Sequence, residues 1–168
     1  MSQYIDCYWL SNSRSSAYCK SFLDAFLPER EESAVDYPMP LHADRPSVVY
    51  SDVDKLMSYL EDNPNGEYML YWRNIENDSS YAHGMIFYTN DGCTIVGLSI
   101  EGRSLEDQAV TKKFLQVQKS LDADIGCVTV EEIAPLNSVE FREFCQKRYV
   151  PSSYANRKEN MLLGRQLY

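Results

Sequence analysis

The stretch "YAHGMIFYTNDGCTIVGLSIEG", residues 81–102, constrains the fold more than any other part of the chain. It holds two apolar runs joined by Asp91-Gly92, a strong β-hairpin signal because both central residues of a type I′ turn need positive φ. A two-residue turn places Phe87 opposite Val96 and leaves apolar residues on both faces. We therefore expect helices, a second sheet or a partner protein to cover both faces. One predicted face carries Met85, Phe87, Val96, Leu98 and Ile100, and the other carries Ile86, Tyr88, Cys93 and Ile95.

The rest of the chain alternates between strand and helix signals. Aromatic and β-branched residues between turn signals predict strands over residues 3–10, 67–75 and 125–130. Capping residues followed by apolar positions three or four apart predict four helices. They run from Ser15 or Ser16 to Leu27, from the capping box at 51–54 to just before Pro64, from Ser104 to Leu121, and from Asn137 to Arg148.

This order predicts one α+β domain over residues 1–168, with a mainly antiparallel sheet of about five strands and helices packed against it. A length of 168 residues suits a single domain with a substantial core. Residues 29–46 contain three prolines, five acids and no periodicity, which predicts a long loop of the kind that often carries function. Residues 150–168 are expected to form a C-terminal tail docked on the body through Met161-Leu162-Leu163.

The charge of the chain is strongly acidic and unevenly distributed. The formal net charge is −9, and residues 1–80 hold 14 Asp and Glu against 6 Lys and Arg. An acidic surface repels phosphates, so we expect neither nucleic acid nor an anionic membrane as a partner. The 13 tyrosines suit contact surfaces, because a Tyr ring packs while its hydroxyl stays hydrated. A basic protein partner is the natural complement.

The cysteines and the first residues predict a cytoplasmic protein. The five cysteines include no C-x-x-C spacing and lie mostly in apolar patterns, which is typical of reduced core thiols. The start "MSQYIDCYWL" lacks the basic and apolar regions of a signal peptide. No run of 18 apolar residues occurs, so no membrane span is predicted.

Candidate catalytic groups are few. Cys93 and His83 form the one Cys/His pair within a single motif, but the hairpin register separates them by about 23 Å and places them on opposite faces. They cannot then exchange a proton. His42 and His83 are the only histidines and lack partners at metal-ligand spacing. With no phosphate-binding or nucleophile-elbow motif either, the sequence predicts no enzyme, no cofactor and no metal site.

The strand and hairpin over residues 67–102 resemble a known class of proteins. The aromatic run "YWR" at 71–73, the hairpin "GMIFYTNDGCTIVGLSIEG", the size and the charge resemble the small acidic immunity proteins of bacterial polymorphic and contact-dependent toxin systems. The resemblance implies a protein that binds one cognate toxin domain tightly and blocks its active site or another surface that the toxin needs. It carries over no catalytic residue, because this role needs none.

The acidic segment supplies the predicted contact residues. A toxin that attacks nucleic acid would be basic, so an acidic inhibitor can imitate its phosphate ligand and associate quickly through electrostatic steering. Trp and Arg are enriched at interface hot spots. We therefore add the neighbouring Trp72 and Arg73 to the predicted contact residues. The predicted partner-binding residues are Glu29, Glu31, Glu32, Asp36, Asp44, Asp52, Asp54, Trp72 and Arg73.

Two alternative functions stay open at this point. The first is a small-molecule-binding or regulatory domain with a pocket between sheet and helices, lined by Tyr71, Trp72, Tyr81 and His83. The second is an enzyme of an unrecognised kind with His83 as general base. A partner could also add a strand to an exposed edge of the sheet.

Overall fold

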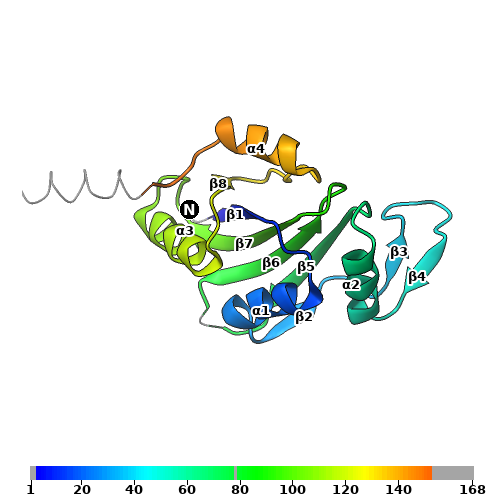
Figure 1. Ribbon diagram of the computed structural model, residues 1–168. Helices are drawn as coiled ribbons and strands as arrows, with labels where there is room; N and C mark the ends of the chain where they lie inside the picture. Colours follow the sequence, from blue (N-terminus) through cyan, green and yellow to red (C-terminus); the bar gives the residue numbers. More distant parts are fainter. Residues whose placement is uncertain (1–2, 78, 153–168) are drawn as a thin grey trace, which may run out of the picture.

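A computed structural model of the chain describes residues 3–77 and 79–152. These residues form a six-stranded antiparallel sheet with helices packed against it and a two-stranded sheet to one side, which confirms the predicted α+β class (Figure 1). Within them, no helix is long and apolar enough to cross a bilayer. The predicted docking of the C-terminal tail concerns residues 153–168, which lie outside the described residues. Across the sheet the strands are β2 (Arg30–Glu32), β5 (Tyr68–Asn74), β6 (Tyr81–Tyr88), β7 (Thr94–Gly102), β1 (Gln3–Ser11) and β8 (Gly126–Thr129).

The sheet has six strands rather than the five expected, because the segment predicted to be a loop contains short strands. Its first strand, β2, pairs with β5 and forms one edge of the main sheet. Two others, β3 (Tyr37–Met39) and β4 (Val48–Tyr50), pair with each other as the small second sheet. Each spans three residues, which is too short to show the alternation by which a strand is recognised in a sequence.

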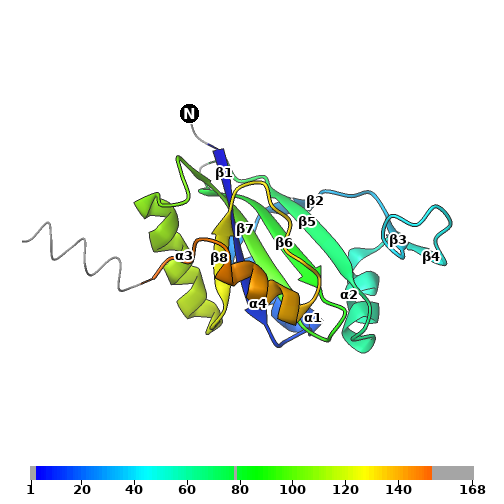
Figure 2. The same ribbon diagram turned by 90° about the horizontal axis from the view of Figure 1, so that it is seen from above.

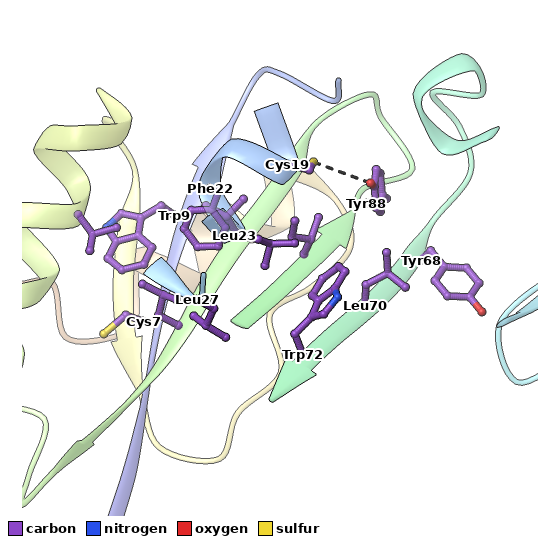
Figure 3. Packing of buried hydrophobic residues seen from close by; sticks show 14 of the residues in the cluster. Cys7, Trp9, Cys19, Phe22, Leu23, Leu27, Tyr68, Leu70, Trp72 and Tyr88 are labelled. Carbon is purple, nitrogen blue, oxygen red and sulfur yellow. Dashed lines mark hydrogen bonds between the residues drawn. The ribbon is translucent and has the colours of Figure 1, made fainter. Parts of the chain in front are cut away.

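Among the described residues, helices lie on both faces of the main sheet (Figures 1 and 2). The first face packs against α1 (Ser16–Phe26), α2 (Val53–Asp62) and α3 (Gln108–Leu121), which contribute Phe22, Leu56 and Phe114 among others to the larger core cluster. Figure 3 shows part of this cluster, including Leu23 of α1, Leu27 just after it, and Leu70 and Trp72 of β5. The second face packs against α4 (Ser138–Gln146) through Phe141, Phe144 and Cys145.

Two of the four helix caps were predicted correctly. The side chains of Ser15, Asp52 and Asn137 accept backbone hydrogen bonds at the starts of α1, α2 and α4; Ser15 and Asn137 were expected, whereas the capping box at 51–54 places the cap of α2 at Ser51, one residue too early. The third helix, however, begins after Asp107 and not after Ser104. The Asp107 carboxylate accepts hydrogen bonds from the N–H groups of Arg103 (3.0 Å) and Ala109 (2.9 Å), so it closes a turn before the helix as well as capping it.

The predicted register of the central hairpin is wrong by one residue. Phe87 lies opposite Ile95 and not Val96, because the turn has three residues and not two. Thr89 closes it, donating its N–H to the Cys93 carbonyl (3.0 Å) and accepting the Cys93 N–H on its hydroxyl (2.8 Å), while Gly92 takes the positive φ of 88°. A one-residue slip exchanges the faces of one strand relative to its partner. One face therefore holds Met85, Phe87 and Ile95, and the other holds Ile86, Tyr88, Val96, Leu98 and Ile100.

The hairpin turn docks on the start of α4. The Asp91 carboxylate accepts hydrogen bonds from the backbone N–H (3.1 Å) and the hydroxyl of Ser138, at the positive end of the helix dipole. Asn90 donates its backbone N–H to the Leu136 carbonyl (2.9 Å), and its side chain accepts a bond from the Asn137 amide (2.9 Å). Asp91-Gly92 is therefore an architectural turn that ties the sheet to α4.

Arg14 joins three separate parts of the fold. Its side chain is only 7% exposed and lies over the Tyr88 ring, 5.0 Å from the centroid. The guanidinium donates hydrogen bonds to backbone carbonyls at the end of α2, in the turn before β5 and in the β6–β7 turn. Last-turn carbonyls of a helix lack intrahelical donors, so a buried cation there supplies both hydrogen bonds and a favourable charge. The acceptors are Leu60 (2.6 Å), Asn63 (3.1 Å), Gly66, Thr89 (2.7 Å) and Cys93 (3.1 Å).

We predict that Arg14→Lys lowers the free energy of unfolding by about 2–4 kcal/mol, because one ammonium cannot reach carbonyls that a planar guanidinium spans. Urea denaturation monitored by tryptophan fluorescence measures the loss. Arg45→Lys, at an exposed position of the β3–β4 connection, is the matched control and should change stability by less than about 0.5 kcal/mol. Equal stabilities of the two variants would contradict a structural role for Arg14.

Candidate functional site

The predicted acidic segment forms a projecting arm. We call residues 29–54 the acidic arm; it comprises β2, β3, β4 and their connections, and ends in the first turn of α2. Figures 1 and 2 both show β3 and β4 beyond the edge of the main sheet. All seven predicted acidic contact residues, Glu29, Glu31, Glu32, Asp36, Asp44, Asp52 and Asp54, are exposed.

Buried tyrosines hold the arm against the body. Tyr37 of β3 is 4% exposed and belongs to the larger core cluster. Tyr68 of β5, which is 1% exposed, donates its hydroxyl to the Pro38 carbonyl at 2.9 Å. On the other side, the rings of Tyr50 in β4 and Tyr59 in α2 pack 6.0 Å apart. The acidic side chains are therefore carried by backbone with a defined position, which lowers the entropy cost of binding.

Four of the seven acidic residues already form hydrogen bonds or ion pairs within the protein. Glu31 forms an ion pair with Arg73 across the β2–β5 ladder, and Glu32 accepts a hydrogen bond from the Tyr37 hydroxyl at 2.6 Å. Asp52 caps α2, and Asp54 lies 3.2 Å from the Lys20 ammonium. Of these seven acidic residues, Glu29, Asp36 and Asp44 form no side-chain hydrogen bond or ion pair with another described residue. Their carboxylates are exposed and available to a partner.

Arg73 and Trp72, the two predicted contact residues that are not acidic, differ in exposure. Arg73 is exposed beside Glu31 at the edge of the sheet. Trp72 is 3% exposed and packs in the larger core cluster, because successive residues of a strand point to opposite faces (Figure 3). The Trp72 ring is therefore not at the surface, and the contact surface has to be assembled without it.

Two hollows lie where the second face of the sheet is not covered by α4. The arm hollow, of about 410 Å³, lies under the arm and is walled by Tyr37, Leu41 and Met69 among others. The sheet hollow, of about 280 Å³, lies over β1, β6 and β7. Tyr71 and Ile133 line both, so the hollows are neighbours along one surface. Further lining of the sheet hollow comes from Asp6, Tyr8, His83, Met85, Ser99, Glu131 and Glu132.

Asp6 is the unusual residue of the sheet hollow. It is a carboxylate in the middle of an otherwise apolar strand, and its Oδ1 accepts the Ser99 hydroxyl at 2.6 Å. Burial raises the pKa of Asp6, and the nearby charge of Glu131 adds to the rise, while the Ser99 hydrogen bond and His83 oppose it. The folded protein therefore holds this carboxylate in surroundings that favour its neutral form.

The connection from β8 to α4 forms the rim of the sheet hollow. Glu131 takes a positive φ of 55°, a strained conformation for a residue with a side chain. The next residue, Glu132, accepts the Tyr8 hydroxyl on its carbonyl (2.9 Å) and pairs through both carboxylate oxygens with Arg148 (3.0 Å each). The charge of Glu132 is thus paired within the fold, whereas no arginine among residues 3–77 and 79–152 forms such a pair with Asp6 or Glu131.

The lining predicted for a small-molecule pocket is half correct. Tyr71 and His83 line the sheet hollow. Trp72 and Tyr81 belong to the other face, where Tyr81 packs edge-on against Phe26 with the ring centroids 5.7 Å apart. Sequence reasoning missed Asp6, Tyr8, Ser99 and Glu131, although the lone charge of Asp6 within an apolar strand was a usable signal.

Cys93 and His83 remain too far apart to act together. His83 lies opposite Ser99, six residues along β7 from Cys93, which separates them by about 20 Å. The one-residue shift of register places them on the same face, contrary to expectation. Burial, and next the charge of Asp91, raise the pKa of Cys93, so its thiol is not activated. Among residues 3–77 and 79–152, no group of three His, Cys, Asp or Glu side chains is arranged to hold a metal ion.

We predict that Asp6→Asn unfolds at a higher temperature than the unmodified protein near neutral pH. Because the folded pKa of Asp6 is raised, its ionised form opposes folding above that pKa, and the opposition fades as pH falls through it. Asn keeps the oxygen that accepts the Ser99 hydroxyl. Thermal unfolding of both proteins at about pH 7 and about pH 4 should show a difference that shrinks at the lower pH. A variant that is less stable at neutral pH would show instead that the charge of Asp6 supports the fold.

No protein-family model matches the chain, and comparisons with curated proteins and with solved structures found no match either. The function has to be argued from the residues of the acidic arm and of the two hollows.

Proposed function

We propose that this protein is an immunity protein that binds a basic toxin domain and neutralises it. The observation that carries the proposal is the acidic arm, a fixed, projecting segment whose acidic side chains are all exposed. The resemblance of residues 67–102 to bacterial immunity proteins names the class of partner. The arm and the adjoining open face of the sheet form the proposed contact surface.

Charge is the first support for this proposal. Residues 29–67 contain ten Asp and Glu against three Lys and Arg, a balance of −7 in a chain whose total is −9. Most of the net charge therefore lies on the arm and α2, at one end of the molecule (Figure 1). A field of one sign concentrated in this way attracts an oppositely charged partner and orients it before contact, which raises the association rate.

Exposed apolar side chains on the same segment are the second support. Val35 is 97% exposed, and Val48 and Val49 of β4 are 42% and 50% exposed. Tyr59 on the neighbouring α2 is 38% exposed. Protein interfaces combine apolar contact residues with a polar rim. An acidic surface that contacted only water would gain nothing from exposed valines. The arm therefore has the composition of a binding surface.

We expect the partner to contact side chains of this surface and not to pair as an added strand at an edge of the sheet. The free edge at β2 has only three residues, Arg30, Glu31 and Glu32, and short charged edge strands discourage pairing with another chain. At the opposite edge, Val128 of β8 already forms a bridge with Tyr149. We therefore expect the partner to lie across the arm and the open face and not to extend the sheet.

The proposal is tested by capture followed by neutralisation. The full chain, immobilised as bait in lysate of its source cell, should retain one stoichiometric basic protein that elutes as salt is raised. The captured protein, expressed alone, should be toxic or enzymatically active, and an equimolar amount of this chain should abolish that effect. Retention of no protein, or of a protein whose activity is unchanged by binding, would refute the proposed function.

We predict that a triple charge reversal of Glu29, Asp36 and Asp44 to Lys slows association with the captured partner by about tenfold or more at low ionic strength. It should also flatten the dependence of the association rate on salt. These three side chains have no structural partner in the described residues, so the fold should persist. Surface plasmon resonance at several salt concentrations measures both effects.

The matched control reverses three acids away from the arm. Glu106, Asp124 and Glu143 are exposed, and their replacement by Lys changes the net charge by the same amount. If steering depends on the arm, this control should slow association by less than about threefold. Equal slowing by the two triple variants would show that total charge, and not the arm, governs the encounter.

A further inference from the structure

The sheet hollow carries negative charge that the described residues leave unbalanced. Asp6, Glu131 and Glu132 line it, and none of its described lining residues is a lysine or arginine. Arg148, which lies nearby, already pairs with Glu132. Among the described lining residues, His83 is the one basic side chain. Its ring lies edge-on to the Tyr4 ring, with the centroids 5.4 Å apart. A ligand that completes this hollow should therefore bring a positive charge.

The walls of the hollow suit a flat cation. Tyr8 and Tyr71 line it and both pack on Phe87, with centroids 5.8 Å and 5.6 Å away; Tyr71 is 36% exposed and Tyr8 only 2%, so Tyr71 supplies most of the accessible aromatic surface. Phe87 is fully buried, so it holds the two tyrosines in place before any ligand arrives. Aromatic faces attract guanidinium groups, which stack on them while donating hydrogen bonds in their own plane. The chemistry matches the side chain of arginine.

The size and position of the hollow indicate where that arginine comes from. A volume of about 280 Å³ falls at the lower limit for sites that enclose small molecules, and suits a single side chain. The hollow shares Tyr71 and Ile133 with the arm hollow, so a protein lying on the arm reaches both. We infer that the sheet hollow is the anchor pocket for one arginine of the partner protein, held between Asp6 and Glu131 against the Tyr8 and Tyr71 rings. This inference rests on the proposed function and adds the partner's anchoring residue to it.

The anchor and the arm have different physical roles. Exposed charges such as Asp44 act over a distance and chiefly change the rate of encounter. A charge pair formed in the sheet hollow acts after docking and chiefly changes the rate of dissociation. The raised pKa of Asp6 agrees with this role, since a carboxylate that weakens the free protein gains its counterion only when the partner binds. The two surfaces can therefore be separated by kinetics.

The first test needs no partner. N-acetyl-arginine methylamide is titrated into the ¹⁵N-labelled full chain, and the neutral citrulline analogue of the same shape serves as control. We expect saturable shifts of the Ser99 and His83 amide signals with the arginine compound, at a dissociation constant of about 1–20 mM. Asp6→Asn should weaken this binding by about tenfold. No saturation up to roughly 50 mM, or equal shifts with the citrulline compound, would overturn the inference.

The second test uses the captured partner. Asp6→Asn and Glu131→Gln should each raise the dissociation rate by about tenfold or more and change the association rate by less than about twofold. Glu106→Gln, a neutralisation outside the hollow, should change neither rate. If the triple arm variant slows association but Asp6→Asn leaves dissociation unchanged, the anchor is refuted while the proposed function stands. If no partner is captured, the proposed function fails and the arginine titration alone decides the chemistry of the hollow.

Discussion

The Arg14 guanidinium is the interaction on which the rest of the arrangement depends. Its acceptors are carbonyls from the end of α2, the turn before β5 and the β6–β7 turn. The acidic arm runs between β2 and α2, so its two ends are fixed separately: one by pairing with β5, the other by this clamp. A buried cation whose hydrogen bonds within the described residues all go to backbone carbonyls thus fixes α2, to which the acidic arm leads. Backbone acceptors fix geometry without contributing further charge to an already acidic surface.

The two faces of the sheet explain where the candidate site lies. Three helices cover the first face, whereas α4 and the strained connection before it cover only part of the second. The uncovered remainder carries Tyr71 and His83 next to buried Phe87 and Met85. A sheet apolar on both sides needs cover on both sides, and the part without a helix is where a partner can supply it.

Sequence reasoning predicted the local features and failed on those set by distant contacts. The helix caps at Ser15 and Asn137 and the existence of the hairpin follow from short-range chemistry, and they were predicted from a few neighbouring residues. The hairpin register was missed, because Asp91-Gly92 favours a two-residue turn whereas Thr89 closes a three-residue one with its own hydroxyl. Asp6 was visible as a charge in an apolar strand. Its place in the sheet hollow was not, because only the fold brings it together with Tyr71, His83 and Glu131.

The position of β1 has a consequence for how the chain assembles. This strand is the first in sequence but lies inside the sheet, between β7 and β8, so that Ile5 pairs with Ile100 and Trp9 with both Val96 and Gly126. Contacts across such separations carry a large loop-closure cost and slow folding. During synthesis, β1 has to wait for nearly the whole domain to emerge, leaving its apolar residues without partners. Folding is therefore expected to finish late and nearly all at once, when β1 pairs with β7 and β8 and completes the sheet.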